Sequence, residues 1–135
     1  MHDGRLALDL GMQLPRVMVD GVQIQQVLMN LVHNAFEAQG PEHDGAPFEV
    51  RIATRLTDGC DVEVSVSDLG PGLASEVEQK IFEPFFTTKP AGTGLGLAIS
   101  RSIIKAHDAR LGYRANQPRG ACFYFVLPAY QETPS

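Results

Sequence analysis

The chain has 135 residues, which is enough for one domain with a substantial core. With 44% hydrophobic and 20% charged residues it has the composition of a folded protein, which argues against disorder. Eleven Lys and Arg against sixteen Asp and Glu give a net charge of -5, so we expect no nucleic-acid binding. No apolar run could span a bilayer and no signal peptide follows Met1, so we expect a cytoplasmic location for this fragment, with membrane anchoring of any parent protein left open.

The first half of the chain combines alternating apolar residues with one helical repeat. Asp20, followed by Gln23 three positions later, has the capping-box pattern and predicts that a helix begins at Gly21. Asp58-Gly59 is a hairpin turn signal between two alternating runs. The elements predicted here are strands at 5–10 and 16–20, a helix at 21–39, and antiparallel strands near 48–52 and 62–66.

In the second half, Ser75 and Glu78 repeat the capping pattern and predict a short helix. The elements predicted here are a helix at 75–82, a mobile loop at 83–92, a helix at 95–107, and strands at 111–114 and 122–127 around a turn. This order predicts an α+β fold: a two-layer α/β sandwich with helices on one face of a mixed, mostly antiparallel sheet. We expect a single domain over 1–135, with 129–135 as a tail. Cys60 and Cys122 lie in apolar runs and are expected to be reduced thiols in or near the core.

Two of four clusters that can carry chemistry lie before residue 75. Asn30 and Asn34 share one face of the first predicted helix, where their side-chain oxygens can serve a hard cation such as Mg²⁺. A polar edge of an amphipathic helix is the alternative. Asp68 follows a strand, and its carboxylate can accept a hydrogen bond from an amine such as that of adenine, while Gly70 and Gly72 let the backbone come close. Taken alone, this segment is more typical of a plain surface turn.

The other two clusters follow each other directly. The segment 83–90 holds two adjacent phenylalanines and Lys89, which can reach a phosphate; an aromatic anchor with a solvated lysine is the alternative. In Gly92-Thr93-Gly94-Leu95-Gly96-Leu97, glycines before a helix leave N–H groups free to cradle a phosphate, with a plain glycine hinge as the alternative. The spacing fits neither a Walker A loop nor a Rossmann fingerprint. Together the four clusters are the parts that an ATP·Mg²⁺ site needs.

In this order the motifs resemble those of the catalytic ATP-binding domain of sensor histidine kinases, within the superfamily shared with gyrase, Hsp90 and MutL-type ATPases. The resemblance runs from about residue 6 to 128. The segments 27–38, 68–72, 82–89, 92–97 and 120–128 resemble, in turn, the N box, the first G box, the F box, the second G box and a closing G-x-x-F-x-x-x-L-P segment. The NAxEA and PFFTTK versions are most similar to kinases of the NtrB and FixL type.

The resemblance implies a role for each matching residue. Asn34 would ligate Mg²⁺ with help from Asn30, and both would count as catalytic residues; Asp68 would bind the adenine amine. The glycines Gly70 and Gly72 would fit the loop to the base. The phosphates would be held by Lys89, Gly92, Thr93, Gly94, Leu95, Gly96 and Leu97, with 85–92 as an ATP lid.

Two departures from the family pattern are visible. Glu37 and His33 stand where many relatives place basic residues, so how the phosphates are neutralised on that side of the site is left open. A His-Gly-Gly segment is replaced by His107-Asp108-Ala109, in which Asp108 can still take a left-handed conformation.

The implied function is that of a protein-histidine kinase, a transferase that passes the γ-phosphate of ATP to a histidine on a separate dimerisation and phosphotransfer domain. The phosphorelay of a two-component signal-transduction system would continue to a response regulator. The acceptor histidine itself is absent, so we expect a monomeric fragment that binds ATP but hardly phosphorylates itself. Alternatives are an ATP-hydrolysing or anti-sigma-type serine kinase domain of the same superfamily, or a non-enzymatic module. Asn30 disfavours the first two, which carry Glu at that position, and the intact site residues weigh against the third.

Overall fold

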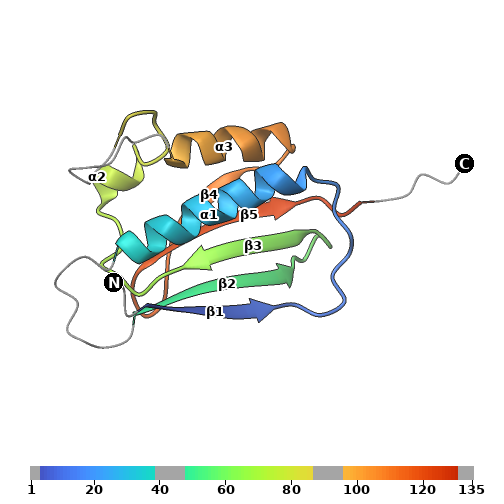
Figure 1. The fold of residues 1–135 in the computed structure, drawn as a ribbon, viewed down its shortest axis with the longest axis horizontal. Helices are drawn as coiled ribbons and strands as arrows, with labels where there is room; N and C mark the ends of the chain where they lie inside the picture. The colour runs from blue at the N-terminus through green and yellow to red at the C-terminus, as the bar shows by residue number, and fades with distance from the viewer. Residues whose placement is uncertain (1–3, 39–47, 87–95, 131–135) are drawn as a thin grey trace, which may run out of the picture.

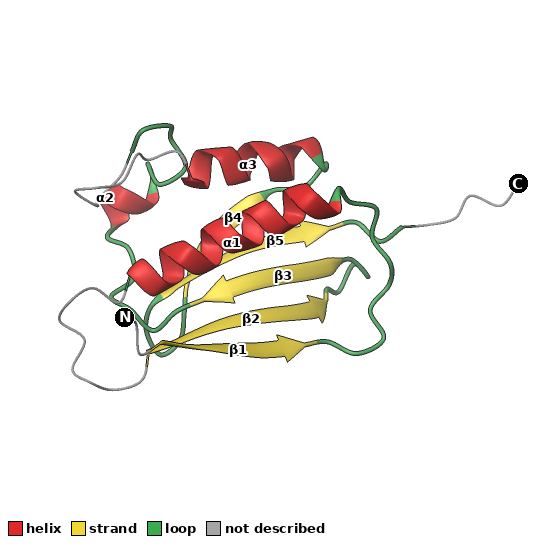
Figure 2. Ribbon diagram, in the orientation of Figure 1, coloured by secondary structure: helices red, strands yellow, loops and turns green. Residues whose placement is uncertain are grey.

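The computed structural model describes residues 4–38, 48–86 and 96–130. They form two layers, a five-stranded sheet and helices packed on one of its faces (Figures 1 and 2). The strands are β1 (Gly4–Leu10), β2 (Phe48–Leu56), β3 (Val62–Ser67), β4 (Leu111–Ala115) and β5 (Ala121–Leu127), and the helices are α1 (Gly21–Glu37), α2 (Ser75–Glu78) and α3 (Gly96–Ala106). The predicted α+β sandwich is therefore confirmed.

The strands lie in the order β1-β2-β3-β5-β4. Strand β1 runs parallel to β2, whereas β2–β3, β3–β5 and β5–β4 are antiparallel pairs, which confirms the prediction of a mixed, mostly antiparallel sheet. Val64 of β3 is aligned with Phe125 of β5, and Val66 with Phe123. Because side chains alternate along a strand, these four lie on the same face of the sheet, and all four are buried.

Helices α1 and α3 lie side by side over that face (Figure 1). Val27, Leu31 and Ala35 recur at three- or four-residue spacing along α1, so they form one stripe, and the sheet buries it. Ile104 is the corresponding buried residue of α3. Full burial of a side chain such as Leu31 stabilises the fold by roughly 1.5–3 kcal/mol, so this stripe holds α1 firmly against the sheet.

One predicted strand is wrong. Residues 16–20 contribute only an isolated bridge between Val17 and Ala129, supported by a hydrogen bond from the Tyr130 N–H to the Arg16 carbonyl. The segment climbs from the sheet layer to the start of α1 (Figure 1), so it cannot follow a neighbouring strand for several residues. The same contacts hold the first two residues of the segment that we expected to be a tail.

The two capping predictions have different outcomes. Asp20 caps α1, and its carboxylate accepts a hydrogen bond from the Gln23 N–H (3.1 Å). Ser75 is not a cap: it is already the first residue of α2, the N-cap position is Ala74, and no side chain caps it. Helix α2 also ends at Glu78 instead of residue 82, because three-residue turns such as that from the Lys80 N–H to the Val77 carbonyl replace helical bonds.

Cys60 corrects a further prediction. It is exposed in the turn between β2 and β3, at a φ of 68°, where its N–H donates to the Thr57 carbonyl. The turn places it at the tip of the hairpin, away from the core. Cys122 is a buried thiol on β5, as expected, and both cysteines are free. Asp108 has a φ of 58°, which confirms the left-handed conformation expected after α3.

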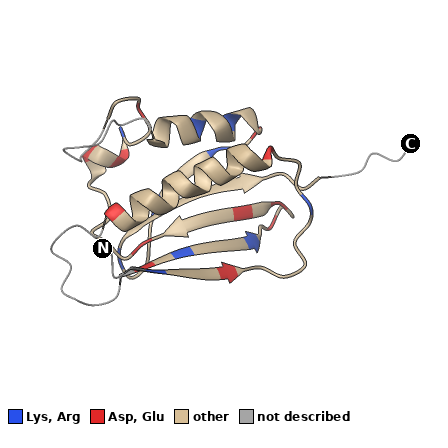
Figure 3. Cartoon of the chain, in the orientation of Figure 1, with Lys and Arg blue, Asp and Glu red and all other residues tan. Residues whose placement is uncertain are grey.

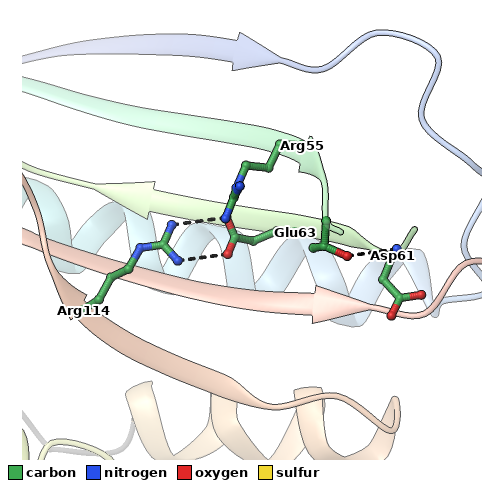
Figure 4. A network of polar contacts seen from close by, with 5 residues as sticks. Arg55, Asp61, Glu63 and Arg114 are labelled. Carbon is green, nitrogen blue, oxygen red and sulfur yellow. Dashed lines mark hydrogen bonds and ion pairs between the residues drawn. The ribbon is translucent and has the colours of Figure 1, made fainter. Parts of the chain in front are cut away.

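The sheet face away from the helices carries an ion network around Glu63 (Figure 4). The Glu63 carboxylate is 4% exposed and accepts from Arg55 Nε at 2.6 Å and from Arg114 Nη1 at 2.9 Å. The Arg114 guanidinium also stacks over Tyr124. Hydrogen bonds from Arg114, and then from Arg55, outweigh burial and lower the pKa of Glu63 to about 2. The network therefore joins β2, β3 and β4 through one ionised carboxylate.

Candidate functional site

The predicted site residues that the structure describes come from three elements that meet at one end of the molecule. The last turns of α1, the loop after β3 and the start of α3 all lie at this end (Figure 1). Asn30 Nδ2 of α1 donates to the Gly96 carbonyl (3.5 Å) and to Ser100 Oγ (3.2 Å) of α3. A Cβ atom on Gly70 would lie 3.1 Å from the Ala38 carbonyl oxygen, so the loop after β3 touches the end of α1. Three of the four sequence clusters are therefore in direct contact.

Part of the predicted site lies outside the described residues. This concerns Lys89, Gly92, Thr93, Gly94 and Leu95, together with most of the segment predicted to be an ATP lid.

Asp68 is the buried acid of the site, with 3% of its surface exposed. Its Oδ1 accepts hydrogen bonds from the N–H groups of Gly70 (2.8 Å) and Ala121 (3.3 Å). Its Oδ2 has no hydrogen-bond partner among the described residues. Burial raises the pKa of Asp68, and the two backbone N–H groups only partly offset this effect. A buried carboxylate oxygen without a donor is costly for the fold, which is typical of an atom that awaits a ligand donor.

The turn between β4 and β5 holds the Asp68 loop in place through hydrogen bonds. Asn116 Nδ2 donates to the Asp68 carbonyl (2.8 Å), and Arg119 Nε donates to the Gly70 carbonyl (3.0 Å). Gly120, at a φ of 104°, packs so tightly that a Cβ atom there would lie 2.0 Å from the Asp68 carbonyl oxygen. No sequence pattern indicated Asn116 and Arg119, because both are ordinary turn residues. Gly120 was visible only as the first residue of the closing motif.

Asn30 and Asn34 lie one turn apart on α1, and both are half-buried. Asn30 uses its amide nitrogen to hold α3, and its Oδ1 has no hydrogen-bond partner within the described ranges. Within those ranges no group of three or more His, Cys, Asp or Glu side chains could hold a metal ion. A cation here would therefore depend on amide oxygens and on oxygens of the ligand itself, a donor set that suits Mg²⁺. The neighbouring His33 and Glu37 pair with each other on the same helix.

The glycines of the site differ in what surrounds them. Gly72 has a φ of 78°, a left-handed conformation that favours glycine. Among the described residues, a Cβ atom on Gly96 would meet nothing within 4 Å, so the described part of the structure leaves the start of α3 uncrowded. Leu97, next to it, packs against the core and so fixes the direction of the helix. The first N–H groups of α3 thus lie at an uncrowded helix start, the arrangement that binds anions.

Charge elsewhere on the molecule is dispersed. Figure 3 shows Lys and Arg residues scattered over both layers without a basic face in this view. None of the described helices is long and apolar enough to cross a membrane.

Comparisons with known proteins identify this arrangement. The family described as histidine kinase-, DNA gyrase B-, and HSP90-like ATPase matches residues 19–131. The chain belongs to this ATPase family. Its sequence is 45% identical over 130 residues to the sensor protein FixL of Bradyrhizobium diazoefficiens, covering 95% of this chain and 24% of FixL. The chain thus spans about a quarter of the length of such curated relatives.

Solved structures place the chain within the family. The catalytic domain of the histidine kinase ThkA superposes with a TM-score of 0.79 at 38% identity, over 94% of this chain and 80% of that one. The full-length ShkA, solved in complex with AMPPNP, superposes with a TM-score of 0.75 at 29% identity, over 96% of this chain and 27% of ShkA. The chain is therefore an ATP-binding catalytic domain of the sensor histidine kinase type, and the predicted resemblance to FixL-type kinases is confirmed.

Proposed function

We propose that this domain binds ATP with Mg²⁺ and supplies the γ-phosphate to a histidine on a separate dimerisation domain of the same kinase. A response regulator would then receive the phosphate, with the reaction taking place in the cytoplasm. The observation that carries the proposal is the Oδ2 of buried Asp68, which has no donor among the described residues and lies next to the contacts that join α1, α3 and the loop after β3.

The adenine end of the proposed site rests on Asp68. The exocyclic amine of adenine would donate to Oδ2, the oxygen that lacks a donor in the described structure. Because Oδ1 is held by two backbone N–H groups, the carboxylate would be oriented before the ligand arrives. ShkA, whose structure holds an ATP analogue, has the same fold, which supports a nucleotide as the ligand.

The phosphate end rests on α1 and α3. Asn34 would ligate Mg²⁺, with Asn30 assisting through its oxygen, and the first N–H groups of α3, together with residues 89–95, would hold the phosphates. When bound, Mg²⁺ would bridge phosphate oxygens and neutralise charge that builds up during transfer. The protein's own contribution would be to position ATP and to exclude water from it.

A separate acceptor histidine is supported by how the two described histidines are used. His107 is hydrogen bonded through both ring nitrogens, to the Asp20 N–H and to the Ile103 carbonyl. His33 pairs with Glu37 on the surface of α1. His107 is thus committed to the fold through both ring nitrogens, and His33 lies on an exposed helix surface outside the proposed site, which supports an acceptor on another domain. His2 and His43 lie outside the described residues.

The alternative of ATP hydrolysis needs a base to activate water. In the hydrolysing ATPases that this domain resembles, that base is a glutamate four residues before the Mg²⁺-binding Asn. This chain has Asn30 at that position. The Asn30 amide nitrogen is also committed to Gly96 and Ser100 of α3. A carboxamide is not basic enough to accept a proton from water, which favours the kinase over the hydrolase.

Calorimetric titration of Asp68→Asn with ATP tests the nucleotide site. We expect micromolar, Mg²⁺-dependent binding by the wild type and a loss of roughly 10- to 100-fold in the variant, because the Asn amide would place a donor against the adenine amine. The Asn oxygen can still accept from Gly70 and Ala121, so the fold should be retained. Asp58→Asn, an exposed aspartate in the β2–β3 turn, is the matched control.

No heat of binding with the wild type, or equal affinities of wild type and Asp68→Asn, would exclude this site. A second experiment separates kinase from hydrolase. The domain is mixed with a dimeric acceptor-histidine domain and γ-labelled ATP, and acid-labile phosphohistidine is measured together with free phosphate. Steady hydrolysis without a labelled histidine would favour the hydrolase.

A further inference from the structure

Strand β1 is an open, apolar edge of the sheet. It pairs with β2 on one side, and no strand of the described chain lies on its other side. Leu6, Leu8 and Leu10 are 48%, 61% and 56% exposed. They are aligned with Val50, Ile52 and Thr54 of β2, so they lie on the helix-bearing face of the sheet, but α1 covers the strands beyond β1 (Figure 1). A row of exposed leucines on an edge strand is a template for pairing with another strand.

The hydrogen bond just after the last residue of β1 shows which backbone groups of the strand point toward β2 and which point toward the open edge. The Gly11 N–H donates to the Thr54 carbonyl (2.9 Å), one residue beyond the aligned pair of Leu10 and Thr54. Because backbone groups point to alternate sides along a strand, the odd-numbered residues of β1 face β2 with their N–H and C=O groups. The even-numbered residues, including the three leucines, direct theirs to the open edge.

The β1 sequence is self-complementary when two copies run antiparallel. With Ala7 opposite Ala7, Leu6 lies opposite Leu8 of the second copy, and these are the residues whose backbone groups face the open edge. Arg5 of each copy then lies opposite Asp9 of the other copy, so the pairing contains two Arg–Asp pairs. Shifting the pairing so that Leu6 or Leu8 is at the centre loses both Arg–Asp pairs. Complementary charges on directly opposed residues favour a pairing, and like charges oppose it.

Both charged residues are available for such a pairing. Arg5 and Asp9 are exposed, and neither forms an ion pair within the described part of the chain. They also lie on the sheet face away from the helices, since they alternate with the leucines.

We propose that β1 is a homodimerisation edge: two copies of this chain pair antiparallel through β1, with Ala7 opposite Ala7 and Arg5 opposite Asp9. The two five-stranded sheets then form one continuous sheet. One short strand pair buries less than the roughly 1,200 Å² of a stable interface, so the dimer is weak and the dilute chain is monomeric. A dissociation constant on the order of 0.1–1 mM is expected for an interface of this size.

Charge reversal with cross-complementation tests the proposal. Sedimentation equilibrium is measured up to millimolar concentration for the wild type, Asp9→Arg and Arg5→Asp. Each variant places like charges opposite each other, so homodimerisation should weaken at least tenfold. An equimolar mixture of the two variants should form a heterodimer with nearly wild-type affinity, and the double variant Arg5→Asp/Asp9→Arg should dimerise like the wild type. Asp58→Arg and Arg110→Asp change the net charge equally, away from the edge, and should leave dimerisation unchanged.

A second measurement on the wild type does not depend on any variant folding. Amide hydrogen exchange of Leu6, Leu8 and Leu10 should slow as protein concentration rises, while Ala7 and Asp9, which face β2, should not change. A wild type that stays monomeric at millimolar concentration overturns the proposal. So does a mixture of the two variants that fails to associate, or a dimer whose leucine amides exchange at the monomer rate.

Discussion

Asp68 divides its two carboxylate oxygens between the fold and the proposed ligand. Oδ1 is anchored by the N–H groups of Gly70 and Ala121, whereas Oδ2 is unpaired within the described structure. The arrangement holds only if the loop keeps its shape, and the β4–β5 turn enforces that shape through Asn116 and Arg119. We therefore propose Asn116 and Arg119 as positioning residues: they would not touch the nucleotide, but they hold Asp68, the acid proposed to bind it.

Arg119→Ala should weaken ATP binding while leaving the fold intact. The substitution removes the hydrogen bond to the Gly70 carbonyl, and a charge-assisted bond of this kind contributes about 1 kcal/mol or somewhat more. Binding to the loosened loop should fall roughly 3- to 10-fold by calorimetry. Arg110→Ala removes the same charge from an exposed site, and we expect it to leave the affinity unchanged. Equal effects of the two substitutions would mean that Arg119 acts only through the overall charge.

The sequence could predict Asp68 but not its supports, for a physical reason. Asp68 follows a strand and precedes two glycines, so its pattern is local and is visible along the chain. The hydrogen bond from Arg119 to Gly70 joins residues 49 positions apart, and that from Asn116 to Asp68 joins residues 48 apart. Such contacts arise only when β5 pairs with β3, and no local pattern encodes them.

Among the elements, α1 and α3 are tied together at both ends. At one end Asn30 holds the start of α3; at the other, His107 Nε2 accepts a hydrogen bond from the Asp20 N–H (3.0 Å). His107 Nδ1 lies 2.8 Å from the Ile103 carbonyl and so donates to it. The predicted capping box is therefore half right. Asp20 caps the helix, but its own N–H, which the Gln23 side chain would bind in a capping box, is bound by His107 instead. The failed cap at Ser75 shows that the same local pattern does not decide the outcome alone.

His107→Ala should lower stability without changing the nucleotide site. The variant leaves the Asp20 N–H and the Ile103 carbonyl without their partner, which costs about 1–2 kcal/mol. For a chain of this size, Tm should fall by about 3–8 °C in a thermal scan. His33→Ala, on the exposed face of α1, is the control and should change stability by less than about 0.5 kcal/mol. A Tm for His107→Ala equal to that of the control would contradict a tie between the two helices.

At the scale of the whole molecule, the pKa values of two buried carboxylates are shifted in opposite directions. The pKa of Glu63 is lowered to about 2 by Arg114 and Arg55, whereas burial raises the pKa of Asp68. Ionised Glu63 therefore stabilises the folded sheet above its unfolded pKa of 4.5. The contribution of Asp68 to stability is present below its unfolded pKa of 3.8 and is lost as the pH rises through its folded value. A carboxyl group whose pKa is raised by burial is typical of functional sites.

Glu63→Gln should destabilise the protein in a pH-dependent way. The stabilisation from Glu63 is complete above about pH 4.5 and is lost as the pH falls toward 2, because protonation breaks the bonds to both arginines. We expect the variant to lose about 2 kcal/mol at pH 7, less than the full shift implies because Arg55 and Arg114 remain partly exposed. Urea unfolding between pH 7 and 2.5 should show the difference from wild type shrinking with acidification. Glu49→Gln, which removes the partner of exposed Arg51, should change stability little at any pH. A difference between Glu63→Gln and wild type that stays constant across this range would show that the network contributes packing, not charge.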